Sequence, residues 1–491
     1  MPQGQLTIVS NRGPAEFGRD PDGERTVKRG GGGLVTALSG LVSHRDALWI
    51  ASAMTEEDVA VARESDGPTK IELDGIDYRV LMVESDPTAY ERFYNIIANP
   101  ILWFVQHYLW DLSNAPDIRQ SEKDAWEHGY LTVNEDIARA VVGAIEGQSE
   151  PLVMFHDYHL YACPALVRAE RPDALLQHFV HIPWSQPDSW KIIPTPWRER
   201  IFEGLLANDI VGLHTAAYCR NFLDCCRDLL GLEVDYERNA VSYDGRETWV
   251  REYPLSIDAK RMQRAAASEE VERYERELLK RRREHLIIRV DRADLSKNVL
   301  RGFTAFDVFL EQHPEFRARV TFIAHLQPSR QDVPEYAEYL ERIEALVAVV
   351  NHRHGTTDWM PVDLRIYENF PEAVARYKQF DLLMVNSLFD GMNLVAKEAP
   401  VVNERDGVLM LSENTGAHEE LGSCAISVNP FDIQEQADAI HRALTMDPEE
   451  KRDRAERLRE IILSRDPGTW VDEQLADIHA KSESDRARGE T

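Results

Sequence analysis

The sequence predicts an α/β fold built from two domains, and three observations lead to this prediction. The chain has 491 residues, which is more than a single compact core usually serves. Short apolar runs typical of buried strands alternate with helical patterns in both halves. Polar turns follow several of these runs, and open parallel sheets bind their ligands at such strand ends. We therefore expect one parallel sheet in each half.

The composition narrows the class of protein. Hydrophobic residues make up 43% of the chain and charged residues 29%, as in ordinary globular proteins. No run is long enough to cross a bilayer, and no basic, apolar leader stands at the start, so we expect a cytoplasmic protein. The formal net charge of −29 argues against nucleic acid as a partner. A phosphate-bearing substrate would therefore need local Lys or Arg side chains.

The cysteines indicate no disulfide framework and no zinc site. The five of them show no paired spacing, so we expect reduced and mostly buried thiols. We expect no metal and no cofactor, and the sequence leaves a homo-oligomer open. The cysteines are Cys163, Cys219, Cys225, Cys226 and Cys424.

The first half opens with a strand at residues 6–9 and a polar turn that contains Arg12. Residues 20–23 contain an Asp-x-Asp pattern that binds metal in some sugar transferases, but no strand precedes it and we expect a surface turn. Four glycines, ending at Gly33, precede a helical pattern at residues 35–42, so backbone can approach a phosphate or sugar closely. The spacing is not that of a P-loop, and a mobile loop is the alternative.

Two further strands of the first half end in ionisable residues. Residues 151–155 lead to Asp157, and residues 178–181 end at His181. Because parallel strands end at the same edge of a sheet, we expect these two side chains to lie together and to be functional. The aromatic residues at 89–112 should be mostly core, although such rings also form platforms for sugars.

A strand at residues 249–254 and a charged helix at residues 259–283 mark the domain boundary. We expect an N-terminal α/β domain at 1–255 and a C-terminal α/β domain at 256–465. Residues 466–491 should form a helix that packs back on the first domain, with a frayed tail from Lys481.

The second half repeats the strand-and-turn pattern with cations at the turns. A strand at residues 286–290 leads into a loop that carries Arg292 and Lys297. These two cations suit a diphosphate, and they could stabilise the negative charge that builds on a departing diphosphate without a metal. A strand at residues 320–324 ends near Arg330, which could hold a second phosphate together with Arg12 on the first domain. His352 and His354 lie in a polar connection, where a solvated loop is favoured over a metal pair.

The turn at residues 381–398 is the centre of the predicted site. An apolar strand at residues 382–385 precedes Asp390-Gly391, and a helical pattern follows. If the helix begins near the turn, Asp390, Leu394 and Glu398 share one face and span about 12 Å, roughly the reach of a nucleotide-sugar. An ordinary helix start with Asp as the cap is the alternative. A further strand is expected at residues 407–411.

Taken together, the motifs resemble the trehalose-6-phosphate synthase family, whose members are retaining glucosyltransferases. The resemblance implies a GT-B fold, in which two Rossmann-like domains with parallel sheets face a central cleft. It extends from Leu6 to at least Leu421. Its motifs are Ser-Asn-Arg12, Gly-Gly33-Leu, Tyr94-Asn with Trp103, His-Asp157-Tyr-His-Leu, His181-Ile-Pro, Arg292-x-Asp-x-Ser-Lys297, Ser-Arg330-x-Asp-Val and Asp390-Gly-Met-Asn-Leu-Val-Ala-Lys-Glu398.

The resemblance also implies substrates and residue roles. The donor would be a nucleoside-diphosphate glucose (UDP or GDP), and the acceptor glucose 6-phosphate. The catalytic residues would be Asp157 at the acceptor hydroxyls, His181 at the donor sugar, and Arg292 with Lys297 at the diphosphate. The substrate-binding residues would be Arg12, Tyr94, Trp103 and Arg330 for glucose 6-phosphate, Gly33 in a closing loop, Asp390, Asn393 and Leu394 for the donor sugar and phosphate, and Glu398 for the ribose.

Two departures from the family pattern leave the substrates open. Trp49-Ile-Ala stands where many members have Trp-Ser-Gly, and Phe389 stands where Arg is common. Related enzymes with other phosphorylated acceptors, such as glucosylglycerol-phosphate synthases and pseudoglycosyltransferases that join cyclitols, are the alternative. A non-catalytic sensor is disfavoured because the charged motif residues are all present. A glycosidase using Asp157 and Asp390 is disfavoured because it leaves the cations unexplained.

Overall fold

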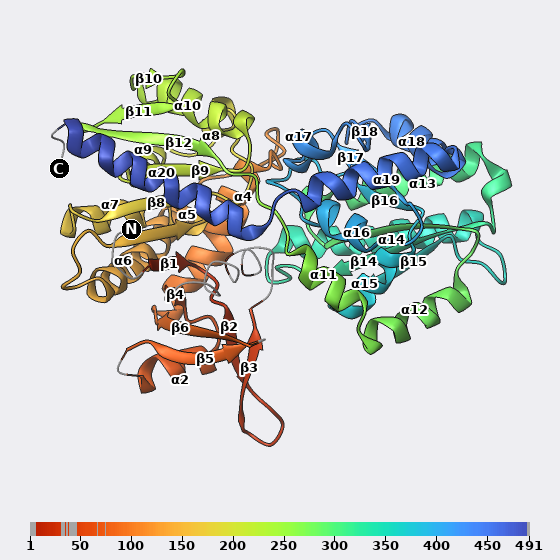
Figure 1. Cartoon of the computed structure of the whole chain (residues 1–491), viewed down its shortest axis with the longest axis horizontal. Helices are drawn as coiled ribbons and strands as arrows, with labels where there is room; N and C mark the ends of the chain where they lie inside the picture. Colours follow the sequence, from red (N-terminus) through yellow and green to blue (C-terminus); the bar gives the residue numbers. More distant parts are fainter. Residues whose placement is uncertain are drawn as a thin grey trace. The chain divides into compact units, whose positions relative to one another are not determined.

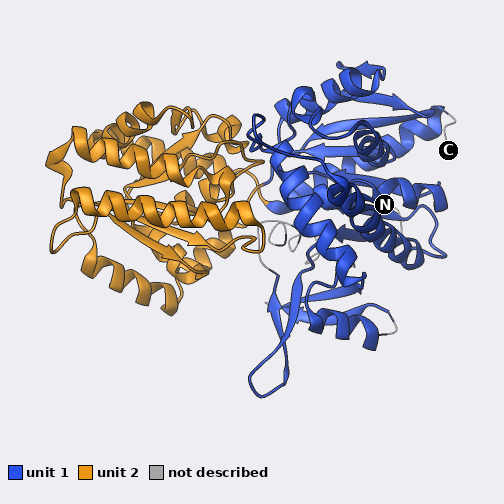
Figure 2. Cartoon of the chain, turned by 180° about the vertical axis from the view of Figure 1, so that it is seen from behind, with its two compact units in different colours: residues 1–255, 467–491 blue, residues 256–466 orange. Residues whose placement is uncertain are grey.

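The computed structural model describes residues 6–30, 35, 38, 47–65, 67–73 and 75–488. The chain forms two compact units (Figure 2). Unit 1 consists of residues 1–255 and 467–491, and unit 2 consists of residues 256–466. Gly33 and most of the predicted helix at 35–42 lie outside the described residues, so their predicted role stays a prediction.

Unit 1 is built on a ten-stranded sheet in the order β10-β11-β12-β9-β8-β7-β1-β4-β6-β5. The strands from β12 to β6 pair in parallel, and the two edges are antiparallel. The bounds are β1 (Leu6–Ser10), β4 (Ala47–Ser52), β5 (Thr69–Leu73), β6 (Ile76–Val83), β7 (Leu152–His156), β8 (Leu175–Phe179), β9 (Ile210–Leu213), β10 (Val234–Asp235), β11 (Ala240–Tyr243) and β12 (Arg246–Glu252).

Helices surround this sheet (Figure 1). One of them, η1 (Arg92–Leu102), is π-helical and carries Tyr94, and π-helical turns are frequent at functional sites. The others are α2 (Glu56–Glu64), α3 (Pro87–Glu91), α4 (Trp103–Gln106), α5 (Gln120–Ala125), η2 (Trp126–Leu131), α6 (Thr132–Ala144), η3 (Tyr158–Leu160), α7 (Cys163–Glu170), α8 (Pro187–Trp190), α9 (Thr195–Leu206), α10 (Ala216–Leu230) and α20 (Pro467–Arg488).

The Asp-x-Asp turn is the exposed tip of a hairpin. Strands β2 (Ala15–Arg19) and β3 (Arg25–Arg29) pair antiparallel on either side of it. The Asp20 carboxylate accepts hydrogen bonds from the backbone N–H groups of Asp22 and Glu24 at 3.0 and 2.9 Å. The predicted surface turn is confirmed. The expectation that no strand precedes it is wrong, since β2 does; this strand escapes the sequence pattern because it is short and only partly apolar.

Helix α20 belongs to unit 1 although unit 2 separates it from the rest of that unit in sequence. Trp470 is fully buried and its indole donates to the Tyr253 carbonyl at 3.1 Å. The Gln177 side chain on β8 donates to the Gln474 side chain at 2.7 Å. The predicted fraying from Lys481 is wrong, because this side chain is buried, pairs with Asp485, and the helix continues to Arg488.

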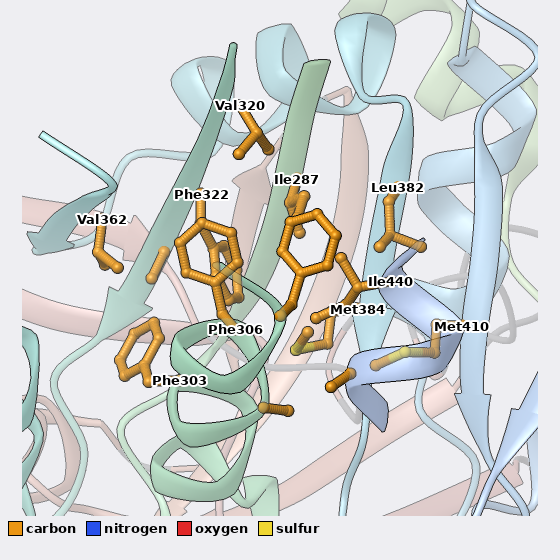
Figure 3. Close-up of a cluster of buried hydrophobic side chains, with 14 of the residues drawn as sticks. Ile287, Phe303, Phe306, Val320, Phe322, Val362, Leu382, Met384, Met410 and Ile440 are labelled. Atoms are coloured by element: carbon orange, nitrogen blue, oxygen red, sulfur yellow. The ribbon is translucent and has the colours of Figure 1, made fainter. Parts of the chain in front are cut away.

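Unit 2 is built on a six-stranded, fully parallel sheet in the order β15-β14-β13-β16-β17-β18. Figure 3 shows Phe303 and Phe306 packed against Phe322 in the core on one face of this sheet. The strand bounds are β13 (His285–Arg292), β14 (Val320–Gln327), β15 (Val362–Ile366), β16 (Leu382–Val385), β17 (Val408–Ser412) and β18 (Ile426–Val428).

Two of the helical predictions in unit 2 need correction. The charged segment at 259–283 forms two helices, because Ser268 caps the second with its side chain. His352 and His354 are not in a loop but end a long helix, where His354 is buried against the Asp307 carboxylate at 2.7 Å. The helices are α11 (Ala259–Ala266), α12 (Glu269–Arg281), η4 (Leu295–Lys297), α13 (Val299–Gln312), η5 (Pro314–Phe316), α14 (Pro334–His354), α15 (Phe370–Gln379), α16 (Val395–Val402), α17 (Ala417–Leu421), α18 (Ile433–Thr445) and α19 (Pro448–Leu463).

The structure also bears on the predictions about the cysteines and about membrane spans. All five cysteines are free and buried, as expected for a reduced protein without disulfides. Among the described residues, no helix combines the length and apolarity that crossing a bilayer requires.

Candidate functional site

In unit 1, the polar residues gather where β7 and β8 end. Asp157 follows β7 directly and has a φ of 72°, a conformation that is costly for a residue with a side chain. Its backbone N–H donates to the Phe179 carbonyl at 2.8 Å, and its carboxylate accepts from the backbone N–H of His181 at 3.3 Å. Such strain is retained mainly where function requires it. The hydrogen bond to His181 confirms that Asp157 and His181 lie together, as the sequence predicts.

His181 lies two residues beyond β8 and belongs to a group of imidazoles. Its Nε2 lies 3.2 Å from Nδ1 of His156, and its carbonyl lies 3.1 Å from Nε2 of His214. Burial, and the neighbouring His156, His214 and His178, hold the pKa of His181 well below its usual value. Burial also lowers the pKa of His156 to about 3. His181 is therefore a neutral hydrogen-bonding group at physiological pH.

Arg12 and Tyr94 also come together in unit 1. The Arg12 side chain is hydrogen-bonded to Tyr94, and the neighbouring Tyr90 hydroxyl donates to Asn11 at 3.2 Å. The Tyr94 ring stacks between Tyr90 and His159, with centroid distances of 6.0 Å to each. This row of rings leaves the exposed guanidinium of Arg12 beside an aromatic surface. Such an arrangement suits a phosphorylated sugar.

Trp103 is buried and is less accessible than Asp157. It begins α4, is 6% exposed, and stacks on the ring of His107 at a centroid distance of 4.0 Å. Its ring also lies 5.6 Å from that of Tyr158, which directly follows Asp157. Trp103 is thus packed behind the residue that carries the strained conformation.

In unit 2, Arg292 is the last residue of β13 and not part of a loop as the sequence suggests. Its guanidinium lies 3.3 Å from the carboxylate of Asp294, which is fully buried. The same carboxylate oxygen lies 3.3 Å from the guanidinium of Arg330. Two cations predicted to bind different phosphates therefore share one buried anion. Sequence reasoning did not single out Asp294, although it is the third residue of the six-residue Arg-x-Asp-x-Ser-Lys motif.

Lys297 and Asp390 form the other close pair in unit 2. The ammonium group of Lys297 lies 2.5 Å from the Asp390 carboxylate, and both side chains are mostly buried. The Lys297 carbonyl is held at 2.7 Å by the fully buried guanidinium of Arg289, which also pairs with Asp291 at 2.9 Å. Arg289 is a second residue that the sequence did not single out, because it sits within an apolar strand.

The turn after β16 differs from the predicted helical face. Helix α16 begins only at Val395, and Asp390 instead forms an isolated bridge with Thr415, so the three-residue face is wrong at Asp390. Asn393 explains the delay: its φ is 71°, and its side chain donates to Asp390 at 3.0 Å and accepts from the N–H of Ala396 at 3.2 Å. Leu394 and Glu398 do lie one helical turn apart, joined by a 2.8 Å backbone bond.

A glycine fixes the position of this turn. Gly416 packs so closely that a Cβ atom there would lie 1.9 Å from the Gly391 carbonyl oxygen. Its N–H donates to the Asp390 carbonyl at 3.0 Å. The segment after β17 therefore supports the Asp390 turn directly, and only glycine fits there.

Glu398 is an unusual carboxyl group on α16. Burial raises its pKa to about 7, and the positive charge of Arg261 opposes that shift only in part. A carboxyl that titrates near neutrality, at the start of a helix beside a polar turn, is a candidate for binding ligand hydroxyls.

One group of side chains outside this region brings possible metal ligands together. His313, Glu315 and His441 offer atoms within 4.8 Å of one another, and this is the one such group found in the described part of the chain. The two imidazole rings are stacked with centroids 3.8 Å apart and planes 3° apart. Because ring-nitrogen lone pairs lie in the ring plane, parallel rings do not aim at a common point. The group is not a preformed metal site.

Each unit therefore assembles part of the predicted set. Unit 1 joins Arg12 to Tyr94 and Asp157 to His181, with Trp103 behind Asp157. Unit 2 joins Arg292 to Arg330 through Asp294, and Lys297 to Asp390 and Asn393. These contacts place cations and carboxylates at the ends of strands, where open parallel sheets bind their ligands.

Comparison with known proteins identifies relatives along nearly the whole chain. The model of glycosyltransferase family 20 matches residues 4–480. Validamine 7-phosphate valienyltransferase of Streptomyces hygroscopicus subsp. jinggangensis is 32% identical over 489 residues, covering 98% of this chain and 95% of its own. The UDP-forming alpha,alpha-trehalose-phosphate synthase of Botryotinia fuckeliana is 33% identical over 489 residues, covering 98% and 89%.

Solved structures show the same architecture. The alpha,alpha-trehalose-phosphate synthase of Burkholderia xenovorans in complex with glucose-6-phosphate has a TM-score of 0.81 and 26% identity, covering 97% of this chain and 100% of its own. A structure from E. coli bound with UDP-2-fluoro glucose has a TM-score of 0.82 and 26% identity, covering 97% and 99%. The prediction of a GT-B fold with parallel sheets is confirmed, as is the predicted family. The chain belongs to glycosyltransferase family 20.

Proposed function

We propose that the protein transfers glucose from a nucleoside-diphosphate glucose to glucose 6-phosphate, with retention, to give α,α-trehalose 6-phosphate. The observation that carries this proposal is the set of charged groups after the neighbouring strands β13 and β16, where Arg292 ends β13 and Lys297 pairs with Asp390. Two cations suit a diphosphate, and a carboxylate beside them suits sugar hydroxyls. The relatives whose structures hold UDP-2-fluoro glucose and glucose-6-phosphate support both substrate classes.

In the proposed reaction, the bond between the donor C1 and the diphosphate oxygen breaks, and C1 bonds to the acceptor hydroxyl on the same face. The leaving diphosphate takes the proton of that hydroxyl, so no enzyme nucleophile is needed. Arg292 and Lys297 stabilise the negative charge that grows on the departing diphosphate. Lys297 is paired with Asp390 in the free protein, so a bound diphosphate competes with that carboxylate for the ammonium group.

On unit 1, Arg12 would bind the phosphate of the acceptor and Asp157 its sugar hydroxyls. His181, held neutral, would donate or accept a hydrogen bond at the donor sugar and carry no charge. We propose that Arg330 also binds the acceptor phosphate, that Asn393 and Leu394 contact the donor, and that Gly33 contacts both substrates.

The test of the proposal is a matrix of donors against phosphorylated acceptors, run with a chelator present. UDP-glucose and GDP-glucose are each paired with glucose 6-phosphate, glycerol 3-phosphate and a cyclitol phosphate, and products are identified by mass spectrometry and NMR. We expect trehalose 6-phosphate with α,α linkage. Absence of transfer to glucose 6-phosphate, with transfer to another acceptor, would overturn the proposal.

A second candidate function is the joining of a phosphorylated cyclitol to an activated cyclitol. It is favoured by the 32% identity to a valienyltransferase that matches 98% of the chain. The matrix separates the two, because the cyclitol phosphate would then be the better acceptor and trehalose 6-phosphate would not form.

The pKa of Glu398 makes donor binding dependent on pH. If Glu398 accepts hydrogen bonds from the donor ribose, its ionised form binds better, and the ionised fraction rises about tenfold between pH 6 and pH 8 for a pKa of about 7. We expect the Kd for the nucleoside-diphosphate glucose to fall by a similar factor. Calorimetry with the intact nucleotide-sugar is the measurement, because its diphosphate has no group that titrates in this range.

The variant Glu398→Gln is the control and should bind with a Kd that is flat across this pH range. A pH dependence that persists in the variant would contradict the assignment to Glu398. The effect on stability has the opposite sign: since the pKa is raised on folding, the contribution of this carboxyl is complete below its ordinary value of 4.5 and is lost as pH rises through 7.

A further inference from the structure

We propose that Asp294 is a positioning residue that holds the guanidinium groups of Arg292 and Arg330 in their working orientation. The inference rests on the proposed function, because it concerns how the phosphate-binding cations of unit 2 are set. Asp294 would touch neither substrate and would act only through its neighbours.

The contacts of Asp294 are those of a central anchor. Its side chain is fully buried, and one carboxylate oxygen lies 3.3 Å from Arg292 and 3.3 Å from Arg330. The other oxygen accepts from the N–H of Ser296 at 3.0 Å and from its hydroxyl at 2.8 Å. The Asp294 carbonyl also accepts from the N–H of Lys297 at 3.0 Å. One residue thus touches both arginines and the turn that carries the lysine.

Tyr336, on helix α14, contacts both Arg330 and Asp294. Its hydroxyl is hydrogen-bonded to the guanidinium of Arg330 and lies 3.5 Å from the Asp294 carboxylate. Arg330 itself has a φ of 45°, so the backbone there is held in a conformation that only its surroundings maintain. The Arg292 side chain is 37% exposed and that of Arg330 is 8% exposed, so Arg292 reaches outward from the shared carboxylate while Arg330 stays mostly buried beside it.

The charge of Asp294 makes its role separable from simple anion binding. Two arginines and one carboxylate leave one net positive charge, and the change Asp294→Asn leaves two. A phosphate or diphosphate should then bind at least as tightly, because a negative charge has gone. Turnover should fall, because an amide does not fix two guanidinium groups and a displacement of about 1 Å can cost 10²-fold in rate.

The experiment therefore measures kcat and nucleotide affinity in the same variant of the full chain. For Asp294→Asn we expect kcat to fall by about 30-fold, while the Kd for UDP or GDP, whichever binds the wild type, stays within threefold or tightens. A variant with wild-type kcat would overturn the proposal. So would a loss of nucleotide affinity as large as the loss of kcat.

The matched control is Asp307→Asn. Asp307 also lies in unit 2, is 9% exposed, and pairs with two side chains, those of Arg353 and His354. Both partners end α14, away from the ends of β13 and β16 where Arg292 and Lys297 lie. Both variants should lower the Tm, but only Asp294→Asn should separate kcat from affinity. An equal loss of kcat in both variants would show that Asp294 is merely structural.

Two further measurements apply if Asp294→Asn does not fold or if the wild type transfers no sugar. If Asp294→Asn does not fold, Tyr336→Phe removes only the hydroxyl that faces Arg330 and Asp294, and kcat should fall several-fold with unchanged nucleotide affinity. If the wild type transfers no sugar, the proposed function fails, and phenylglyoxal labelling still reports on the arginines. Arg292 and Arg330 should be labelled faster in Asp294→Asn than in Asp307→Asn, and equal rates would overturn the role of Asp294.

Discussion

Replacing Arg292 with alanine is expected to lower kcat by about 10³-fold while the fold is kept, as for arginines that stabilise charge on a transferring phosphate group. Arg292 ends β13, and more than a third of its side chain is exposed, so its removal leaves no cavity in the core. Its partner Asp294 keeps Arg330 and Ser296. Steady-state kinetics and circular dichroism on the same preparation test both halves of this expectation.

The control for this variant is Arg319→Ala. Arg319 directly precedes β14, at the opposite end of the strands from Arg292, and pairs with the exposed Glu284 at 2.7 Å. It should keep wild-type kcat, since this exposed ion pair lies at the other end of the strands and contributes little to stability. Near-normal turnover of Arg292→Ala would contradict the proposed role of Arg292 in stabilising the leaving diphosphate.

Replacing Lys297 with methionine should remove turnover and also lower the free energy of unfolding. The ammonium group is 13% exposed and its partner Asp390 is 15% exposed, so the change leaves a largely buried carboxylate without its cation. Breaking such a pair costs about 3 kcal/mol, at the lower end of the range for buried pairs because Ser387 and Asn393 still donate to Asp390. Denaturant unfolding and steady-state kinetics measure the two effects.

The double variant Lys297→Met with Asp390→Asn separates stability from catalysis. Neutralising both partners removes the orphaned charge, so the free energy of unfolding should recover most of its loss. Turnover should stay low, because neither the cation for the diphosphate nor the carboxylate for the sugar is restored. Recovery of turnover together with stability would mean that the pair is only structural.

Much of unit 2 could be predicted from local sequence. The strand at residues 382–385 is found with the same bounds, and apolar runs at 286–290 and 320–324 lie within longer strands. A buried parallel strand is a continuous apolar run with a polar turn at its end, so the apolar run and the turn residues that follow it are sufficient to locate it. The pairing of Asp157 with His181 followed from the same reasoning, because neighbouring parallel strands end together.

The failures share a different cause. Asp390 was placed on a helical face, but Asn393 adopts a left-handed conformation that delays the helix to Val395. The backbone of Asp390 instead forms a bridge with Thr415, 25 positions away. Asp294 and Arg289 were not chosen because a buried charge is recognised by its partners, which a linear sequence does not display. Local pattern therefore finds the elements, while the support of the site depends on contacts between them.

Helix α20 has a consequence for how the chain is made. Residues 467–491 complete unit 1, with Trp470 fully buried against Phe179 and Gln474 bonded to Gln177 on β8. These residues follow unit 2 in the chain, so during synthesis the part of unit 1 made first waits, with Gln177 and Phe179 of β8 uncovered, while some 200 residues of unit 2 are added. A gene fragment that stops at Leu255 would encode an aggregation-prone product. Joining residues 467–491 to it through a flexible linker should yield an autonomous domain.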